Sequence, residues 1–332
     1  MNALILKIKK KHGKMLKPII RKVFRIIGNI FCIIGNISRI FEKNPCVIMY
    51  MEGGLSSQIL RYCKGMWFQE HGMNVKYDLT WYKKKGMDDL GIEERPWRLS
   101  KCFPDLKLEI ASDKEVYRYR PLYGSDVHDL VNKYKGKESM MKPPLYVALY
   151  DFDYLISDFQ MCTKYFNWEK LREILSVQAE KTAREIEQYK QAGKKVIGVH
   201  VRRGDMTIVG GYWKVLTAKY FEEAIKKVAT KESVLYFFSN GFDFVKEEIL
   251  PIVNYESNLV DNHNEDYEDM YLYSLCDVQI ASQGSWGAMA FAFNKNPERK
   301  IVVPCTEKSL CVDSLDKESI YLYLEDDMYL HN

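Results

Sequence analysis

The sequence is poor in the features that stabilise small extracellular or zinc-binding proteins. Its 332 residues include eight cysteines, yet no two of them form a CxxC pair and no histidines accompany them at the spacing of a zinc site. We therefore expect neither a disulfide framework nor a zinc centre, and a reducing compartment suits the chain best. Apolar residues make up 47% and aromatic residues 13% of the chain, which excludes a disordered or fibrous protein and allows two globular domains.

Long apolar runs are also missing. Within the first 44 residues the longest uncharged stretch, 26–38, has 13 residues, whereas a helix that spans a membrane needs about 18 or more. No small-residue cleavage site follows this stretch, so a removable signal peptide is not expected.

Acidic residues are almost absent from the first 44 positions. Eight lysines and three arginines stand there against one acid, Glu42, so the total charge of +4 combines +10 in this segment with −6 in the rest of the chain. Basic residues recur at helical spacing, and apolar residues fall on the opposite side. The basic set includes Lys14, Lys17, Arg21, Arg25 and Arg39, and the apolar set includes Ile20, Phe24, Ile27, Phe31 and Ile34.

This pattern predicts that residues 1–44 form a basic amphipathic helix lying on an anionic membrane surface. The chain would then be cytoplasmic and attached peripherally to the membrane. A helix packed on the protein's own surface and a disordered basic arm that binds nucleic acid are the alternatives. We expect no nucleic-acid partner, because the body of the chain is acidic and its aromatic residues are not interleaved with basic ones.

Alternating strand and helix patterns follow from residue 45 onward. They predict an α/β fold of two Rossmann-like domains, 45–190 and 191–332, that face a cleft and are built on parallel sheets. Segment 82–140 shows weak periodicity and is left unassigned. The expected strands are 46–51, 145–149, 196–201, 233–238, 257–260, 277–281 and 300–303, and the expected helices are 57–70, 166–192, 217–230, 242–250, 265–276 and 286–294.

The hexapeptide His-Val-Arg-Arg-Gly-Asp at 200–205 follows the apolar run 196–199. A buried strand that ends in two guanidinium groups carries fixed positive charge to the carboxyl edge of a sheet, where open α/β folds bind their ligands. The motif therefore favours an anionic ligand, first of all a phosphate ester. Two arginines on a solvated rim are the alternative.

A second constellation lies about 65 residues further along the chain. Gly284 and Ser285 follow the predicted strand 277–281 and begin a helix, and free backbone amides at a helix N-terminus form a ready anion site. Asp269 begins the preceding helix pattern. The acidic stretch around it is by itself typical of a solvated helix start.

Together these motifs resemble the fucosyltransferases that use GDP-fucose. The resemblance covers roughly residues 46–304 and consists of HxRRxD at 200–205, the spacing from Asp269 through Asp277 to Ser285, and an earlier GGLxxQ at 53–58. The nearest pattern is that of the α-1,2-fucosyltransferases of glycosyltransferase family 11, with the α-1,6 enzymes more distant. It implies a GT-B fold in which the first domain faces the acceptor and the second binds GDP-fucose.

The resemblance also implies roles for the donor-binding residues. Arg202 would grip the β-phosphate of GDP-fucose, and Ser285 with the adjoining amides of Gly284 would hold the same diphosphate. Asp269 would read guanine by accepting from N1–H and the 2-amino group, a donor pair that adenine lacks. His200 would lie near the nucleotide.

Other positions would shape the loops of the site. Gly53, Gly54 and Gln58 would form the first domain's loop toward the cleft, and Arg203 and Asp205 would support their own loop through an internal ion pair.

The sequence departs from the family pattern in three places. Ser56-Ser57 replaces the usual Gly-Asn, Ser285-Trp286-Gly287 replaces a longer serine- and tryptophan-rich stretch, and 206–212 lacks the glutamate that serves as base in the α-1,6 relatives. Contacts that the missing asparagine would make to the sugar or the acceptor are therefore in doubt.

The reaction implied is an inverting transfer of L-fucose to the 2-hydroxyl of a galactoside, in a glycan or lipid-linked oligosaccharide. Asp205 and His200 are the candidates for the base. No cofactor or metal would be needed, because an arginine takes the place of a metal ion. Two other functions remain open. One is a metal-dependent glycosyltransferase that uses Asp151 and Asp153 as a DxD motif, and the other is a membrane-bound binding protein that displays the Arg-Gly-Asp of 203–205.

Overall fold

The computed structural model describes residues 44–83, 86, 94–119, 145–147, 162–209, 214–261, 263–305 and 319–330. The predicted basic helix and the Asp151-Phe152-Asp153 motif lie outside these ranges. Within them no helix is both long enough and apolar enough to cross a membrane. The described residues fall into two compact units: unit 1 takes those within 44–50, 65–80 and 108–147, and unit 2 those within 51–64, 81–107 and 162–330.

Unit 1 contains a small parallel sheet. In its described residues three strands lie in the order β2-β1-β3, and their bounds are β1 Val47–Tyr50, β2 Val75–Asp78 and β3 Leu145–Val147. Helix α5 (Asp113–Tyr119) packs on β1 and β3 by burying Val116 and Tyr119 against Ile48 and Tyr146. Strand β2 was not predicted, because its four residues Val-Lys-Tyr-Asp carry too little apolar pattern.

Helix α2 (Leu55–Glu70) contributes residues to both units. In unit 1 it packs closely on β2 through Gly65, where an added Cβ would lie 2.4 Å from the Tyr77 hydroxyl oxygen. Only glycine allows this approach at that position. The predicted strand, glycine turn and helix at 46–70 are therefore confirmed.

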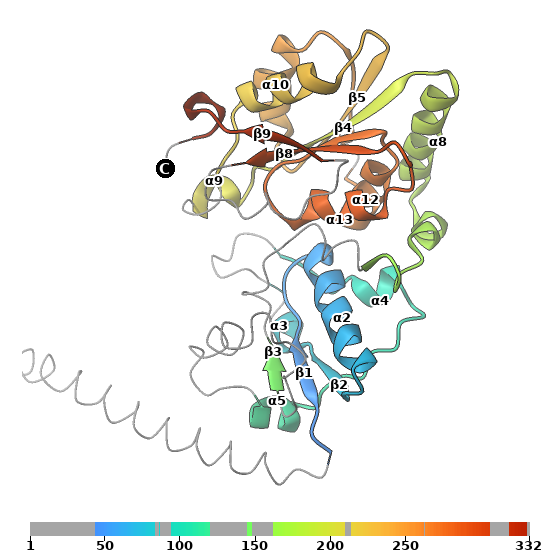
Figure 1. Ribbon diagram of the computed structural model, residues 1–332, viewed down its shortest axis with the longest axis vertical. Coiled ribbons are helices and arrows are strands. Elements are labelled where there is room, and N and C mark those ends of the chain that lie inside the picture. The colour runs from blue at the N-terminus through green and yellow to red at the C-terminus, as the bar shows by residue number, and fades with distance from the viewer. Residues whose placement is uncertain are drawn as a thin grey trace, which may run out of the picture. The chain divides into compact units, whose positions relative to one another are not determined.

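Unit 2 is built on a larger parallel sheet, coloured from yellow-green to red in Figure 1. Its described part has six strands in the order β6-β5-β4-β7-β8-β9, and every paired neighbour is parallel. The bounds are β4 Lys195–Val201, β5 Ser233–Ser239, β6 Glu256–Leu259, β7 Val278–Ile280, β8 Lys300–Cys305 and β9 Ser319–Tyr323. The chain moves outward from β4 in one direction and then resumes at β7 on the other side, so the strand order reverses between β4 and β7.

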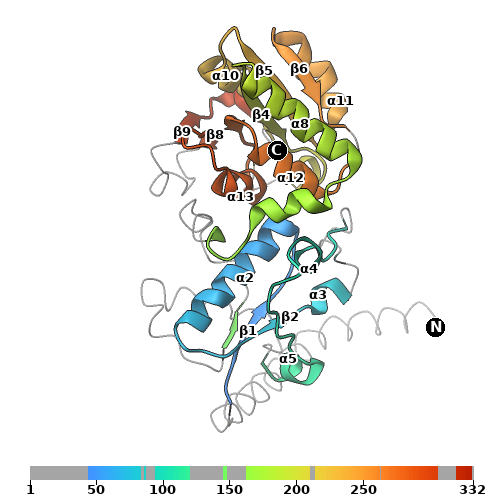
Figure 2. The same cartoon turned by 90° about the vertical axis from the view of Figure 1, so that its right-hand side faces the viewer.

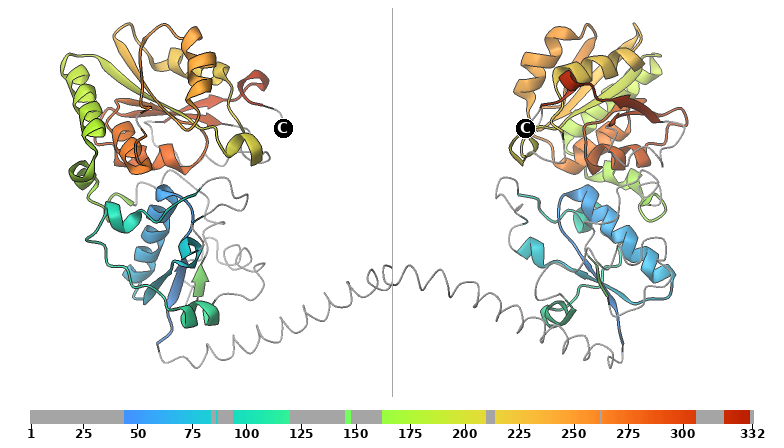
Figure 3. Two further views of the ribbon diagram at one scale, coloured as in Figure 1. Left: turned by 180° about the vertical axis from the view of Figure 1, so that it is seen from behind. Right: turned by 60° about the vertical axis from the view of Figure 1, so that its left-hand side comes forward.

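Helices cover both faces of this sheet. Alternate residues of β4, among them Ile197 and Val199, face α10 (Ala218–Val228), which buries Phe221 and Ile225 in the main core. Figure 1 shows α10 on one side of the sheet and α12 (Asp266–Ser274) and α13 (Ser285–Phe293) on the other, and the views in Figure 3 agree. Helix α8 (Val177–Gln191) lies on the same face as α12 (Figure 2).

Close packing holds α12 against β4. An added Cβ on Gly198 would lie 2.7 Å from Cδ2 of Tyr273 and 3.0 Å from Sγ of Cys276, so a larger residue on this strand would push the helix away. The next residue on that face is His200. The glycine thus brings the helix that bears Asp269 close to the strand that ends at Arg202.

Shorter helical segments complete unit 2. They are α3 Thr80–Lys83, which begins in unit 1, then α4 Leu99–Cys102, η3 Trp168–Ile174, α9 Met206–Val209, α11 Phe242–Phe244, η4 Val245–Ile249, η5 Leu250–Ile252 and η7 Asp326–Met328.

Most elements from residue 195 onward lie within one to three residues of their predicted bounds. The single helix predicted at 166–192 was wrong, because η3 and α8 are separated at Leu175 and Ser176. Ser176 has an extended backbone and its hydroxyl accepts from the amide of Ala179, which starts a new helix. The α/β class with parallel sheets is confirmed, whereas the GT-B arrangement and the boundary near residue 190 stay predictions.

Candidate active site

The predicted donor-binding residues of unit 2 share one edge of its sheet. Arg202 directly follows β4, Ser285 follows β7 at the start of α13, and Asp269 lies in the first turn of α12, after β6. Because the strands are parallel, their carboxyl ends all lie at the same edge of the sheet. The helices that follow the strands begin at that edge. β4 and β7 are the neighbours between which the strand order reverses, the place where open α/β sheets bind ligands.

Ser282 ties the ends of β4 and β7 together. Its hydroxyl donates to the carbonyl of His200 at 2.7 Å and accepts from the backbone amide of Arg202 at 3.0 Å. One buried side chain thus fixes the backbone on both sides of the switch point, the place between β4 and β7 where the strand order reverses.

Asp205 lies between two arginines. One of its carboxylate oxygens accepts from Nη2 of Arg202, and the other accepts from Nη2 of Arg95 at 2.6 Å. The Asp205 side chain is 11% exposed, whereas the arginine side chains are 25% and 29% exposed. The three residues therefore form a partly buried cluster, in which Arg95 is a member that the sequence did not reveal.

Arg203 points elsewhere, and the predicted ion pair between Arg203 and Asp205 was wrong. The Arg203 guanidinium donates to the carbonyl of Leu216 at 3.1 Å and lies 4.0 Å from the centre of the Phe244 ring. Its pKa is lowered, chiefly by burial. Successive side chains of extended backbone point to opposite faces, so these neighbouring side chains leave the strand end in different directions.

His200 is buried on β4 and packs against Trp286 of α13, with ring centroids 4.4 Å apart and ring planes tilted by 31°. Burial, assisted by the nearby Arg202 charge, lowers its pKa to about 3. Its Nδ1 has no hydrogen-bond partner in the described residues. At neutral pH the ring is therefore uncharged and weakly basic.

The start of α13 has the geometry that its sequence suggested. Gly284 caps the helix with φ of 117°, a conformation that favours glycine, and no atom of the described residues lies within 4 Å of the place where a Cβ would stand. The Ser285 hydroxyl lies 2.8 Å from the hydroxyl of Ser56, the second residue of α2. Ser56 was noted only as a departure from the family pattern, and its contact with Ser285 was not foreseen.

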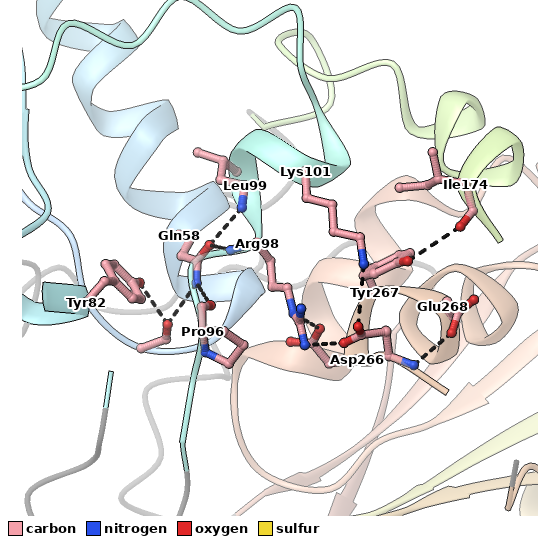
Figure 4. A network of polar contacts seen from close by, with 12 residues as sticks. Gln58, Tyr82, Pro96, Arg98, Leu99, Lys101, Ile174, Asp266, Tyr267 and Glu268 are labelled. Carbon is pink, nitrogen blue, oxygen red and sulfur yellow. Dashed lines mark hydrogen bonds and ion pairs between the residues drawn. The ribbon is translucent and has the colours of Figure 1, made fainter. Parts of the chain in front are cut away.

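The glycine turn at 53–54 is anchored by Gln58, which Figure 4 shows among its partners. The Gln58 amide nitrogen donates to the carbonyls of Gly53 and Pro96, each at 3.0 Å. Its oxygen accepts from the backbone amides of Arg98 and Leu99 at 2.9 and 3.0 Å, at the start of α4.

Gln58 keeps its predicted place in the loop, and whether it also contacts the ligand stays a prediction. Its side chain is fully buried, and both N–H groups and both oxygen lone pairs are already used by the backbone. The residue thus builds the loop. Gly53 keeps its predicted place in the turn, with φ of 80° and a carbonyl that also accepts from the Tyr82 hydroxyl at 2.9 Å, and Gly54 accepts from the amide of Gln58 at 3.0 Å.

Asp269 is a carboxylate in an acidic surrounding. Burial, together with the neighbouring charges of Glu268 and Asp266, raises its pKa to about 7, although Asn264 donates to its Oδ1 at 2.8 Å and opposes the shift. A ligand that donates two N–H groups would stabilise the ionised form. Asn264 was not recognised from the sequence, where no local pattern distinguishes it from other loop residues.

The start of α12 is also held by the segment that carries Arg95. Arg98 forms ion pairs with Glu265 and Asp266, and Lys101 reaches Glu265 at 3.4 Å (Figure 4). One short segment thus contacts Asp205 next to the strand end and the acidic start of the helix that bears Asp269.

Metal ligands do not gather in the part of the chain that the structure describes. No group of three His, Cys, Asp or Glu side chains there is close enough to hold an ion. Asp151 and Asp153 lie outside those ranges, so the alternative metal site that they would form stays untested.

Several solved structures resemble this chain. NodZ, an α-1,6-fucosyltransferase from Bradyrhizobium crystallised with GDP, is 14% identical, with 75% of this chain and 92% of NodZ covered and a TM-score of 0.45. The E. coli ADP-heptose heptosyltransferase II is 10% identical, with 85% and 91% covered and a TM-score of 0.42. POFUT1 in complex with GDP is 11% identical, with 79% and 98% covered and a TM-score of 0.38.

The sequence comparisons are more specific. No curated protein matches this sequence. Residues 148–323, more than half of the chain, match the family model described as glycosyl transferase family 11. This match includes the strand end at Arg202, the helix that bears Asp269 and the helix start at Ser285, the elements that meet at one sheet edge. The chain therefore belongs to glycosyl transferase family 11.

Proposed function

We propose that this protein transfers L-fucose, with inversion, from GDP-β-L-fucose to a sugar hydroxyl, the 2-hydroxyl of a galactoside. Membership of glycosyl transferase family 11 supports the reaction class. The choice of donor and acceptor follows from the motif resemblance at 53–58, 200–205 and 269–285. Arg202, Ser285 and Asp269 are the residues to which we assign the donor.

One structural observation carries the proposal. The Arg202 strand end and the α13 helix start lie at the switch point of the sheet, joined by Ser282. Negative charge builds on the GDP leaving group as the glycosidic bond breaks, and a fixed guanidinium with helix amides can stabilise that charge. Gly284 supports this role because it has no side chain that could cover the helix start.

We assign recognition of the guanine base to Asp269. Its ionised carboxylate can accept from N1–H and the 2-amino group of guanine, which would satisfy a charge that burial otherwise disfavours. Adenine would leave the carboxylate without those donors. A loss of about 1.5–3 kcal/mol, or roughly tenfold or more in affinity, is the expected penalty.

Neither Asp205 nor His200 is assigned as the general base. Both oxygens of Asp205 accept from arginines, and the His200 ring, with a pKa of about 3, is too weakly basic to take a proton efficiently at neutral pH. In this proposal Asp205 holds the arginines, His200 packs beneath the site, and Arg203 supports the loop after β4.

Two further parts of the proposal come from the sequence. The reaction needs no metal, since Arg202 neutralises the leaving diphosphate. The basic segment 1–44 attaches the protein to the cytoplasmic face of a membrane, where a glycan or lipid-linked oligosaccharide would be the acceptor.

The decisive experiment measures GDP release from GDP-fucose with a panel of β-galactosides. Wild-type protein should turn over GDP-fucose and not GDP-mannose, and Arg202→Ala should lose most of that activity. Arg184→Ala is the matched control, because Arg184 is an exposed residue of α8 paired with Glu180. Equal use of GDP-mannose, or wild-type turnover by the Arg202 variant, would refute the proposal.

A further inference from the structure

We propose that Asn264 is a positioning residue of the donor site, whose side-chain amide orients the Asp269 carboxylate and favours its ionised form, so that Asp269 can accept from a base with two adjacent N–H donors. The inference rests on the proposed function, because it concerns the residue to which guanine recognition is assigned. Asn264 lies between β6 and α12, directly before the N-cap residue of that helix.

A hydrogen bond between the two residues spans the first turn of α12. Nδ2 of Asn264 donates to Oδ1 of Asp269 at 2.8 Å. Asn264 is the residue before the N-cap, Glu265, and Asp269 is the fourth residue after that cap. At these two positions helices often carry a pair of apolar residues that pack on each other and fix the entry of the chain. Here a polar pair takes their place, so the contact fixes a carboxylate as well as a helix start.

The start of α12 also has a second support. Glu265 and Glu268 form a capping box, in which each side chain accepts from the backbone amide of the other residue. The Glu268 carboxylate accepts in addition from the backbone amide of Ser176, at the start of α8. Loss of the Asn264 amide should therefore disturb the orientation of the Asp269 carboxylate more than the fold of the helix.

The neighbouring acids are held by other groups. Arg98 pairs with Glu265 and Asp266, and Glu268 accepts from backbone amides. Asp269 receives a neutral amide. A neutral donor stabilises the ionised carboxylate without cancelling its charge, and one hydrogen bond occupies one of about four lone-pair sites. The carboxylate therefore keeps acceptor sites and charge for a ligand.

The electrostatics agree with this geometry. Burial raises the pKa of Asp269 to about 7, the charges of Glu268 and Asp266 add to the rise, and the hydrogen bond from Asn264 opposes it. Without that donor the pKa would rise further, so less of the protein would carry the charge at neutral pH. Helix α13 carries no charged residue. The other charged side chains near α12 are Arg98 and Lys101, which meet Glu265 and Asp266, and Glu169, Arg172, Glu180 and Glu187, which act on Tyr271.

The test measures the Kd values of GDP and ADP by titration calorimetry on the full chain, on both sides of the pKa of Asp269. Both ligands carry a diphosphate, so its titration cancels in the ratio of the two constants. In the wild type the preference for GDP should rise as the pH increases through 7 and then level off. Asn264→Ala should lower this preference about threefold or more at neutral pH and should move its rise upward by about one pH unit, because the donor that favours the charged form is gone.

Asn264→Asp separates a hydrogen-bond donor from a side chain that only fills space. Aspartate has nearly the size of asparagine but presents acceptors and a like charge, so it should lower the preference for GDP more than alanine does. The reverse order, or a wild-type preference in both variants, would overturn the inference and leave the proposed function standing. Asn254→Asp, the same change at an exposed residue before β6, is the matched control and should keep the wild-type preference.

A second control concerns His263, the exposed titratable residue directly before Asn264. His263→Asn keeps a residue type that tolerates the local φ of 53° and should leave the pH profile unchanged. If this variant shifts the profile as much as Asn264→Ala does, the pH dependence belongs to the histidine and the inference is wrong.

Inorganic pyrophosphate reports on the diphosphate site without the base. It should bind equally to the wild type and to all variants. A loss of pyrophosphate binding in the Asn264 variants that matches their loss of GDP binding would show a general loss of structure and would overturn the inference. If the wild type binds pyrophosphate but does not prefer GDP to ADP, Asp269 does not read the base, and the proposed donor is wrong together with the role of Asn264.

Discussion

The hydroxyl oxygens of Ser56 and Ser285 lie 2.8 Å apart, although the two residues are separated by 229 positions in the sequence. Ser56 is one of the two serines at which the sequence departs from the motif that it resembles. In this chain the departure introduces a hydroxyl that contacts the first residue of α13. The first turn of α2 and the proposed diphosphate site at the start of α13 are therefore linked directly.

This contact leads to a prediction about the two serines. Ser285→Ala should raise the Kd for GDP about threefold to tenfold, which corresponds to one neutral hydrogen bond of about 0.5–1.5 kcal/mol. Ser56→Ala removes only the partner of that hydroxyl and should change the Kd less. Calorimetry on both variants checks the order of the effects, and a larger loss in the Ser56 variant would show that the contact, not the Ser285 hydroxyl itself, matters for binding.

Asp269 predicts how GDP binding depends on pH. Its raised pKa of about 7 means that the carboxyl group is protonated below that pH and can no longer accept from both guanine donors. Affinity should therefore fall as the pH drops through 7, approaching about tenfold per unit well below it, and should level off above it.

The matched control is Asp269→Asn at each pH, because phosphate groups also titrate near pH 6. The asparagine variant should bind GDP more weakly above pH 7 and should lack the part of the pH dependence that comes from position 269. Parallel pH profiles for the two proteins would show that Asp269 does not read the base. His200 does not confuse this experiment, because its pKa of about 3 lies far below the range.

Substitution of Gln58 should lower the stability of the protein through lost hydrogen bonds, without any need for a direct contact to the ligand. Gln58→Leu removes the four hydrogen bonds to the carbonyls of Gly53 and Pro96 and the amides of Arg98 and Leu99, which should lower the free energy of unfolding by about 3 kcal/mol or more. Gln69→Leu, the same change at an exposed position of α2, should cost less than about 0.5 kcal/mol. Urea unfolding compares the two, and similar midpoints would contradict the buried role of Gln58.

Chelation tests the role of Arg202 in place of a metal ion. Turnover of GDP-fucose should be unchanged after treatment with EDTA, because the charge on the diphosphate is met by a guanidinium. Loss of activity that Mn²⁺ restores would instead favour the Asp151 and Asp153 motif. Initial rates before chelation, after it and with Mn²⁺ added back distinguish the two outcomes.

The sheet of unit 2 was predictable because its central strands are buried on both faces. β4 and β5 are continuous apolar runs, and the helices between strands keep a helical period. The break at Ser176 was missed because the helical period continues across it, and only the extended backbone and the cap reveal two helices. β2 was missed because its pattern is too short.

In the candidate site, too, some residues could be predicted from local sequence patterns and others could not. A strand end with arginine and a helix start with Gly284 and Ser285 have local patterns that can be read directly. Arg95 has none, since its significance depends on Asp205, which lies 110 positions away. Gln58 was recognised as a residue of the loop motif, whereas its hydrogen bonds to backbone groups of Gly53, Pro96, Arg98 and Leu99 could not be foreseen.

The sequence by itself determined that a parallel α/β sheet carries positive charge at the end of β4, because apolar periodicity and the residues that end a strand are local properties. Only the tertiary structure decided what each charge does. Arg202 shares Asp205 with Arg95, while Arg203 turns to Leu216 and Phe244. Side-chain partners depend on the packing of segments distant in sequence, and no local pattern encodes that packing.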